Sequence, residues 1–458
     1  MRARHVTSDR SYRKPFGAAP TGGTIVLAID VWDEPDASAQ LRLWTDDKGE
    51  QLIGMQCSHR EDCLRFTASI SFEQPDIVWY SFNIRAGNGD IWRYGAREGC
   101  PVGEGAFAYA NPPSFQLTIY SSDRAVAPEW YRHAVVYQIF PDRFHRGADW
   151  KRRVESLKKP RKGAKRDLAE NWDSNPYYKR NRDGSIAVWD CDGGTLEGIQ
   201  EKLGYLHDLG ITCRYLNPIF EAASNQRYDT GDYLVIDPIL GDETSFRRLC
   251  CAAAKRGISV ILDGVFNHTG DDSRYFNRYG NYPDVGAWQS VHSTYRSWYK
   301  IKPDGTYTSW WGVANMPDLN EQNPDYRQYI CGRDGVVRHW LRAGARGWRL
   351  DVADELPDDF IADIKQASLA EKNDAVLLGE VWEDATTKRA YGQLRRYFWG
   401  NELDGTMNYP LRHVLLHFLT GKENAPEAAI ELETLRENYP RDIFYSELNM
   451  LGSHDRVR

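Results

Sequence analysis

The sequence lacks long apolar runs and paired cysteine spacings. Nowhere in its 458 residues does an apolar stretch approach the roughly 20 residues that a membrane-spanning helix needs. Basic residues occur near the N-terminus, but no apolar segment follows them, so a secretory signal is not indicated. None of the eight cysteines forms the Cys-x-x-Cys spacing typical of zinc sites. We therefore expect a cytoplasmic protein whose cysteines are reduced packing residues.

An excess of positive charge is also missing. The formal net charge is -7, whereas nucleic-acid-binding proteins normally carry a basic domain or stripe. One strongly basic segment, 151–166, has no aromatic residues between its charges, so we expect a solvated loop there rather than a binding site. The composition thus predicts neither nucleic acid nor membrane as a partner.

Aromatic residues, by contrast, are abundant, with 16 tryptophans and 26 tyrosines. Aromatic faces can stack on flat sugar rings, but they also fill protein cores. Trp288, Trp298, Trp310 and Trp311 fall in a turn-rich segment. For these four residues, cleft lining and core packing both stay open.

The N-terminal quarter of the chain has short β-prone runs separated by turns, and no helical period. Strands are predicted over 24–29, 41–44, 64–70 and 77–84, and a Gly-Asn-Gly-Asp turn occupies 87–90. Short alternating strands with frequent turns are typical of a β-sandwich. We assign residues 1–125 to this domain.

From residue 126 onward, strand patterns alternate with helical patterns. Leucine and isoleucine repeat at helical spacing over 196–209, with Thr195 as a cap and Gly210 as an end signal. The same helical pattern recurs over 244–255. Asn323-Pro324 has the cap residue and the N1 proline that begin another helix. This alternation predicts an α/β domain with a parallel sheet and crossover helices.

Four short stretches carry the chemistry. In each, a β-prone apolar run leads to an acidic or imidazole side chain, as when barrel strands deliver catalytic groups to one face. The stretches are 263–268 (DGVFNH), 347–355 (GWRLDVADE), 377–382 (LLGEVW) and 452–455 (GSHD). Arg349 lies two residues before Asp351, so both point to the same face of their strand. Paired carboxyl groups of this kind are what glycoside hydrolysis requires.

These stretches resemble the active-site motifs of the α-amylase family of glycoside hydrolases. The segments 137–144, 216–221, 228–233 and 316–320 extend the likeness from residue 131 to the end, and favour the neopullulanase, cyclomaltodextrinase and maltogenic amylase branch. The resemblance implies a (β/α)8 TIM barrel over 126–458, incomplete at its C-terminal end, preceded by a β-sandwich that is similar to carbohydrate-binding domains. A small subdomain is expected at about 268–322. Because the sequence stops three residues after the last motif, we expect about seven barrel strands and a chain that is less stable and less active than a longer version.

The resemblance also implies roles for individual residues. Asp351 would be the nucleophile, Glu380 the general acid and base, and Asp455 the third catalytic carboxylate. Arg349 would keep Asp351 ionised. Substrate would be bound by Tyr228, His268, Arg349, His454, Trp382 and Glu355, with Asp263, Asn267 and Asp318 as structural residues near the site. The chemistry requires no cofactor and no metal ligand is assigned, although a structural calcium ion near Asn267 and Asp318 stays open.

The implied activity is that of a retaining glycoside hydrolase acting on maltooligosaccharides, pullulan, cyclodextrins or fragments of starch and glycogen. Gln226 and Asp354 depart from the family pattern, so the choice between α-1,4 and α-1,6 links stays open. An α-glucan transglycosylase and a non-catalytic glycan-binding protein remain alternatives. The family's N-terminal domain often packs on a partner barrel, so a homodimer is expected. Trp44, Trp79 and Trp92 could supply that contact or simply fill the core.

Overall fold

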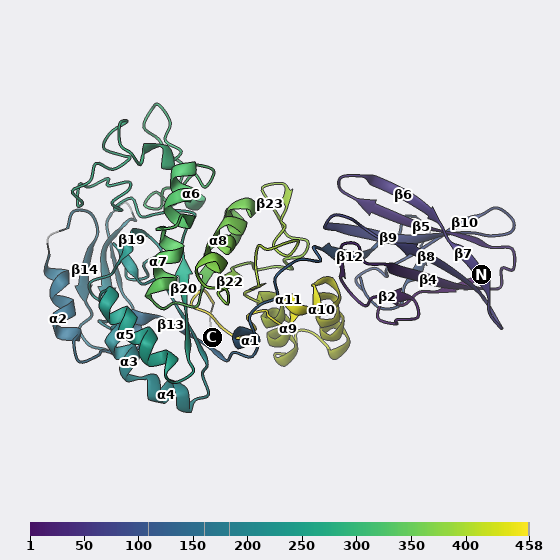
Figure 1. The fold of residues 1–458 in the computed structure, drawn as a ribbon, viewed down its shortest axis with the longest axis horizontal. Coiled ribbons are helices and arrows are strands. Elements are labelled where there is room, and N and C mark those ends of the chain that lie inside the picture. Colours follow the sequence, from purple (N-terminus) through teal and green to yellow (C-terminus); the bar gives the residue numbers. More distant parts are fainter. Residues whose placement is uncertain (109, 160, 183, 457–458) are drawn as a thin grey trace. The chain divides into compact units, whose positions relative to one another are not determined.

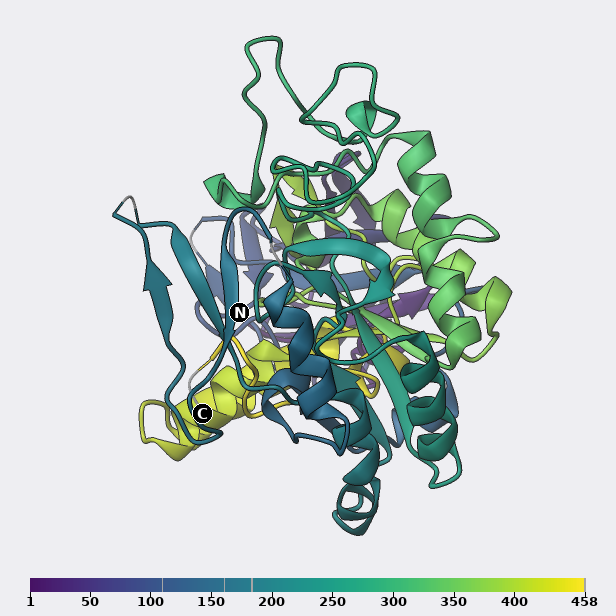
Figure 2. The ribbon, with the colours of Figure 1, turned by 90° about the vertical axis from the view of Figure 1, so that its left-hand side faces the viewer.

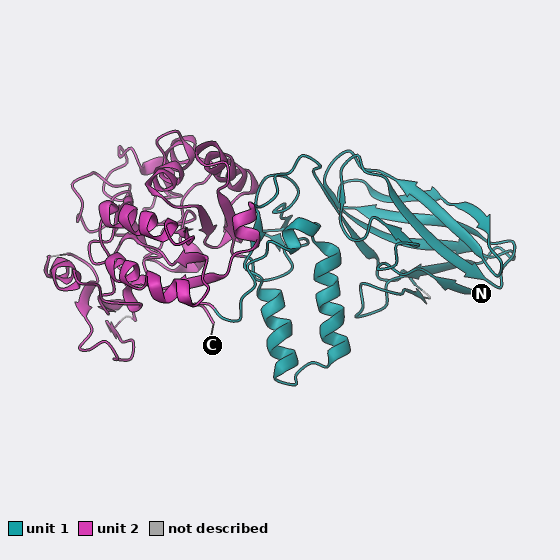
Figure 3. Cartoon of the chain, turned by 60° about the horizontal axis from the view of Figure 1, so that its bottom comes forward, with its two compact units in different colours: residues 1–127, 381–452 teal, residues 128–380, 453–458 magenta. Residues whose placement is uncertain are grey.

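The computed structural model describes residues 1–108, 110–159, 161–182 and 184–456 (Figure 1). Two compact units divide the chain: Met1–Ala127 with Val381–Gly452, and Pro128–Glu380 with Ser453–Arg458 (Figure 3). Packing units are not the same as folding domains, so the predicted domain boundaries at 125 and 126 stay predictions. Across the described ranges, no helix has both the length and the apolar character needed to cross a membrane.

The N-terminal part of the first unit is a β-sandwich, as predicted. One sheet has the order β1 (Arg2–Arg4), β4 (Ile25–Trp32), β8 (Leu64–Ile70) and β7 (Gln56–His59), with β2 (Arg13–Lys14) also paired to β4. The other has the order β11 (Ala106–Ala108), β10 (Ile91–Gly95), β9 (Asp76–Arg85), β12 (Phe115–Tyr120) and β3 (Ala19–Pro20), with β5 (Ser38–Thr45) between β9 and β6 (Gly49–Gly54). Alternating side chains of both sheets form one buried core. All four predicted strands are present.

The remainder of the first unit is mainly helical. It contains β23 (Arg389–Ala390), β24 (Gln393–Leu394), β25 (Gly405–Thr406), α9 (Tyr409–Leu419), α10 (Ala425–Asn438) and α11 (Arg441–Phe444). Within this unit, α10 joins the sandwich through Glu437, whose carboxylate accepts bonds from Arg13 at 2.6 Å and from Thr7 at 2.7 Å. Both members of the Arg13–Glu437 ion pair are buried, so this pair fixes α10 against the sandwich.

The second unit is built on a parallel sheet. Its strands lie side by side in chain order: β13 (Val136–Ile139), β17 (Cys213–Leu216), β20 (Ser259–Gly264), β21 (Gly347–Leu350) and β22 (Val376–Gly379). The helices between them are α3 (Leu196–Glu201), α4 (Leu203–Asp208), α5 (Glu243–Ala254), α6 (Pro324–Cys331), α7 (Val336–Ala343) and α8 (Asp358–Glu371). Helices α5 and α8 pack against β20 and β22, with α7 between them (Figure 2). This arrangement confirms the predicted barrel class and brings all carboxyl ends of the strands to one edge.

Local signals position these helices as expected. The Thr195 side chain accepts a bond from the Gly198 amide at 3.0 Å, and Gly210 adopts the positive φ of 80° that ends the helical pair α3 and α4. Asn323 caps α6 in the same way, through the Tyr326 amide at 3.0 Å. A short helix, α1 (Glu129–Arg132), precedes the first strand of this sheet, β13.

Most basic side chains of the segment 151–166 are exposed, as expected, but parts of the segment are helical or β-structured rather than a loop. It contains part of α2 (Trp150–Val154), η2 (Glu155–Lys158) and the start of β14 (Lys165–Leu168), which pairs with β16 (Ile186–Cys191). Arg161 donates to Asp272 at 2.6 Å and Arg166 to Asp237 at 2.6 Å. Two buried carboxylates from distant parts of the chain thus anchor Arg161 and Arg166.

Two smaller predictions have mixed outcomes. All eight cysteines are free, and Cys213 and Cys250 are buried as expected, but Cys251 is exposed. In the insertion 268–322, Trp298 is buried against Tyr275 and Tyr329, so core packing is the correct reading for this residue. The insertion has little regular structure beyond the short turns η3 (Arg296–Trp298) and η4 (Trp310–Gly312).

Candidate active site

Three carboxyl groups meet at the carboxyl edge of the parallel sheet. Asp263 lies near the end of β20, Asp351 directly follows β21, and Glu380 directly follows β22. These strands are hydrogen-bonded neighbours, and the register places Asp263 opposite Arg349. The strand order alone therefore brings the predicted nucleophile and the predicted acid to adjacent positions.

A single guanidinium joins these carboxylates. Arg349 Nη1 lies 2.8 Å from Asp263 Oδ1 and 2.9 Å from Asp351 Oδ1. Its Nη2 lies 2.8 Å from Glu380 Oε2. The side chain of Arg349 is 0% exposed, so these contacts are made without competing water. Arg349 thus holds Asp351 and Glu380 at the two ends of one planar group.

The backbone after β21 adds a further contact to Glu380. Val352 adopts φ 40° and ψ 55°, a left-handed conformation that is strained for a β-branched residue. In this conformation its amide donates a hydrogen bond of 2.9 Å to Glu380 Oε2. The same carboxylate oxygen is therefore fixed from two directions, by Arg349 and by the backbone.

Burial dominates the protonation of Asp351. Loss of solvation raises the pKa of Asp351 well above its usual value, the nearby guanidinium of Arg349 opposes this rise, and the charge of Glu380 adds to it. Arg349 thus acts in the expected direction, favouring the ionised form of Asp351 that a nucleophile needs, while burial acts against it. The repulsion between Asp351 and Glu380 is mutual, so an ionised Asp351 also favours a protonated Glu380.

A second group of side chains is hydrogen-bonded to Asp263. The Tyr228 hydroxyl donates to Asp263 Oδ2 at 2.9 Å and lies 2.6 Å from His454 Nε2. The two rings are stacked, with centroids 5.3 Å apart and planes 6° apart. Asp455 Oδ1 lies 3.2 Å from His454 Nε2. The predicted residues Tyr228, His454 and Asp455 are thus brought together beside Asp263.

Burial lowers the pKa of His454 to about 4, so the imidazole is neutral at pH 7. Gln138 donates to Nδ1 of this ring at 2.7 Å, and Asn217 donates to the Tyr228 hydroxyl at 3.0 Å. With Nδ1 as the acceptor, Nε2 carries the proton and donates to Tyr228, which in turn donates to Asp263. The hydrogen bonds therefore run in one direction toward the carboxylate.

Sequence reasoning missed three of these residues. Gln138, Tyr215 and Asn217 lie in or directly after β13 and β17, and the Tyr215 hydroxyl also donates to Asp263. Gln138 and Asn217 fall inside motifs that were recognised, but no role was derived for them. Their position at the carboxyl ends of the first two strands was the available signal.

His268, Trp310 and Trp311 form a separate stack of aromatic rings. The ring of His268 is buried and stacks on Trp310 at 5.5 Å, while its Nδ1 lies 3.1 Å from Asn267 Oδ1. Burial lowers the pKa of His268 to about 4. Trp310 stacks on Trp311, which is 78% exposed and donates to Glu355 Oε1 at 3.0 Å. For Trp310 and Trp311 this position favours the cleft-lining reading.

The side chains near the postulated calcium position are engaged with neighbouring groups, and calcium binding there stays open. The Asn267 oxygen is engaged by His268, and its amide donates to Glu321 Oε1 at 3.4 Å. Burial raises the pKa of Asp318 to about 6 and that of Glu321 to about 8. No group of three convergent ligand atoms in the described ranges includes Asp318.

Trp382 belongs to the first compact unit, where its ring stacks on Tyr409 with centroids 4.5 Å apart. Its predicted role in substrate binding stays a prediction. Of the two departures from the family pattern, Gln226 donates to the Tyr178 hydroxyl at 3.4 Å, and Asp354 lies in the short turn η5 (Ala353–Glu355).

A parallel β/α barrel with paired carboxyl groups at its carboxyl edge is the architecture of many barrel enzymes. Comparison with known families identifies the one to which this chain belongs. Residues 138–458 match the family described as alpha amylase, catalytic domain. This chain belongs to that family.

Several relatives can be aligned over most of the chain. The amylopullulanase of Thermoanaerobacter thermohydrosulfuricus is 36% identical, covering 99% of this chain and 33% of the relative. The cyclomaltodextrinase of Geobacillus thermopakistaniensis is 33% identical, covering 83% of this chain and 58% of the relative. The solved cyclic alpha-maltosyl-(1-->6)-maltose hydrolase from Arthrobacter globiformis has a TM-score of 0.59 and 32% identity, covering 72% of this chain and 67% of that one. The chain thus spans well under two thirds of the length of these two sequence relatives.

Proposed function

We propose that the chain forms the catalytic part of a retaining glycoside hydrolase that cleaves α-glucosidic bonds, mainly α-1,4 links. Its substrates would be maltooligosaccharides, pullulan, cyclodextrins or fragments of starch and glycogen. The observation that carries this proposal is the bonding of Asp351 and Glu380 to opposite ends of the buried Arg349 guanidinium.

In this proposal, Asp351 attacks the anomeric carbon while Glu380 protonates the departing oxygen. Glu380 then acts as a base and activates the water that releases the sugar from Asp351. Inverting enzymes need a wider gap between their carboxyl groups, because a water molecule must fit between carboxylate and sugar. Two carboxyl groups held by one guanidinium suit the retaining mechanism better.

The remaining residues would hold the sugar. Asp455 and the neutral rings of His454 and His268 suit hydrogen bonds to ring hydroxyls, which strengthen as the sugar distorts toward the transition state. Tyr228 would lie beneath the reacting ring, and the exposed face of Trp311 offers a further stacking surface.

An α-glucan transglycosylase is the principal alternative, since it shares the covalent intermediate and differs only in the acceptor. The relatives named above as cyclomaltodextrinase and as cyclic alpha-maltosyl-(1-->6)-maltose hydrolase favour transfer to water. The names amylopullulanase and cyclic alpha-maltosyl-(1-->6)-maltose hydrolase keep cleavage of α-1,6 links within the proposal.

Two finer proposals accompany this one: a homodimer and a cytoplasmic location. Trp44 is 41% exposed and Trp92 is 43% exposed, so core packing does not account for these two rings and an apolar contact is favoured. Light scattering that detects only a monomer would reject the dimer.

The test combines product analysis with two variants and a control. Maltotriose, pullulan and cyclodextrin are incubated with the protein, and proton NMR follows the anomeric configuration of the first product. We expect the α-anomer first, and loss of turnover by orders of magnitude in Asp351→Asn and Glu380→Gln. Asp334→Asn, at an exposed aspartate, should leave turnover unchanged. An initial β-anomer would contradict the retaining mechanism, and transfer products without free glucose would favour the transglycosylase.

A further inference from the structure

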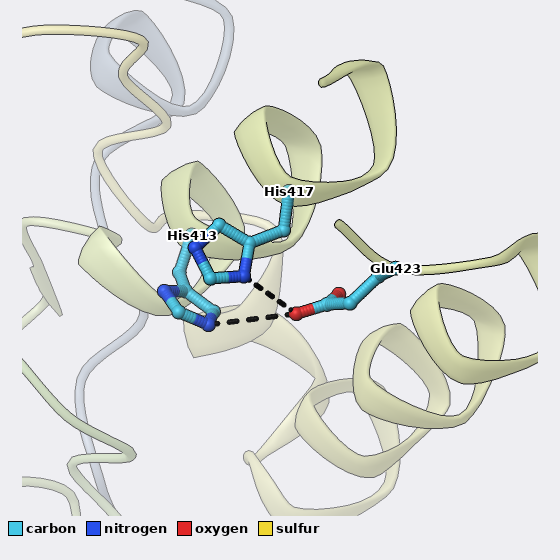
Figure 4. Close-up of side chains that lie close together, drawn as sticks. All are labelled: His413, His417 and Glu423. Atoms are coloured by element: carbon cyan, nitrogen blue, oxygen red, sulfur yellow. Dashed lines mark hydrogen bonds and ion pairs between the residues drawn. The ribbon is translucent and has the colours of Figure 1, made fainter. Parts of the chain in front are cut away.

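A second cluster of reactive side chains lies in the helical part of the first unit. His413 and His417 are one turn apart on α9, and Glu423 follows in the loop before α10 (Figure 4). Glu423 Oε1 lies 2.8 Å from His417 Nδ1 and 3.6 Å from His413 Nε2. One ligand atom from each of the three residues can be chosen so that all lie within 4.8 Å of one another.

The scaffold around the cluster is ordered. Residues four apart on a helix lie on the same face, so the two imidazoles necessarily project together. The turn after α9 is closed by backbone bonds from Lys422 and Glu423 to the His417 carbonyl, at 2.9 and 3.4 Å. Asn424 then begins α10 with a capping box. Glu423 is therefore fixed between two helix ends rather than carried on a free loop.

The charge of Glu423 is incompletely compensated. Its side chain is only 14% exposed, and its Oε2 atom is buried without a hydrogen-bond partner. In the described part of the chain, the two histidines are the basic groups that pair with it. Burial of a carboxylate is costly unless a cation or strong donors satisfy it. A positive ion bound between this carboxylate and the two imidazole nitrogens would satisfy the unpaired oxygen.

We propose that His413, His417 and Glu423 bind a divalent transition-metal ion, zinc by preference. Two imidazoles and one carboxylate form a donor set that suits zinc, with water completing the tetrahedral arrangement. Calcium and magnesium are disfavoured, because they select oxygen ligands. The ion would connect α9 to the start of α10. This site contains none of the residues assigned to glycoside hydrolysis and is independent of the proposed activity.

Titration calorimetry with zinc chloride, on the reduced 458-residue chain in chelator-free buffer, tests the proposal. We expect one zinc equivalent to be lost in His413→Ala/His417→Ala, and the affinity to fall at least tenfold in Glu423→Gln. Cobalt as a second probe should give visible absorption bands in the wild type that the double variant lacks. Circular dichroism of the variants should match the wild type, because His413 is exposed and His417 is partly exposed.

The matched control is His207→Ala. His207 lies on α4 and pairs with the adjacent Asp208, so it offers one exposed imidazole and one exposed carboxylate. Among the described residues, these two belong to no group of three convergent metal ligands. This variant should keep the wild-type zinc stoichiometry. Equal zinc binding by the wild type and the double variant would overturn the proposal, since any zinc would then be held elsewhere, for example by the exposed Cys57. Absence of zinc binding by the wild type would overturn it as well.

Discussion

Arg349 provides the sharpest test of how the site is held together. Replacement by methionine keeps much of the side-chain volume and removes the charge, which leaves Asp263, Asp351 and Glu380 without the cation that they share. Removing one member of a buried ion pair typically costs about 3–5 kcal/mol of stability. We expect a loss of this size in the free energy of unfolding at pH 8, measured by urea denaturation.

The cost of removing Arg349 should depend on pH in a definite direction. Arg349 lowers the pKa of Asp351 against the larger effect of burial, so its removal raises that pKa further. A carboxyl whose folded-state pKa lies above its unfolded value is stabilised by its proton at low pH, and this stability is lost as the pH rises through the interval between the two values. The cost of Arg349→Met should therefore be smaller at pH 5 than at pH 8. Arg349→Lys should be intermediate, because an ammonium cannot reach all three carboxylates in the fork geometry.

A cost below about 1 kcal/mol at pH 8, against the 3–5 kcal/mol expected for a buried pair, would refute this reasoning. So would a cost that is equal at pH 5 and pH 8. A cost that appeared only at pH 5 would reverse the sign of the argument.

Three further predictions concern stability, each followed by thermal melting. Glu447→Gln should flatten the loss of stability between pH 5 and pH 9, because burial raises the pKa of Glu447 to about 8, while glutamine can still bond Thr406. Gly347→Ala should destabilise by about 1–3 kcal/mol and lower turnover as well, since a Cβ there would lie 2.4 Å from Val376 and would force β21 away from β22. Arg214→Met should raise the melting temperature, because this buried guanidinium has no hydrogen-bond partner in the described chain.

The controls for these three variants differ. Parallel pH curves for Glu447→Gln and the wild type would show that Glu447 does not hold a proton in the folded state. Wild-type melting of Gly347→Ala would mean that the strands can separate without cost. A lower melting temperature for Arg214→Met would indicate that its guanidinium is satisfied after all.

The parts of this fold that are encoded locally could be predicted from the sequence. Thr195 and Asn323 cap helices through amides three residues away. Asp351 and Glu380 each follow an apolar strand, and the order of these strands in the chain is also their order in the parallel sheet. The expected position of the proposed catalytic carboxylates required no knowledge of distant residues, because strand order fixes it.

What escaped prediction depends on contacts between distant segments. Arg161 and Asp272 are 111 residues apart, so the ion pair that anchors this part of the basic run had no local signal. Gln138 reaches His454 across 316 residues. The left-handed backbone at Val352 has no sequence signal, since a β-branched residue normally avoids that conformation.

The histidine cluster on α9 is an intermediate case. The spacing of His413 and His417 was visible and predicts a shared helix face. The approach of Glu423 depends on the turn that follows α9, which the sequence does not specify.

The central claim, that Asp351 forms a covalent bond to the sugar with Glu380 as acid and base, has a direct test. Glu380→Gln is incubated with α-maltosyl fluoride, whose leaving group needs no acid, and the protein is then analysed by intact mass and peptide mapping. Because this variant lacks the base that releases the sugar, the account predicts accumulation of one maltosyl group on Asp351. Turnover without any adduct, or an adduct on another residue, would contradict it.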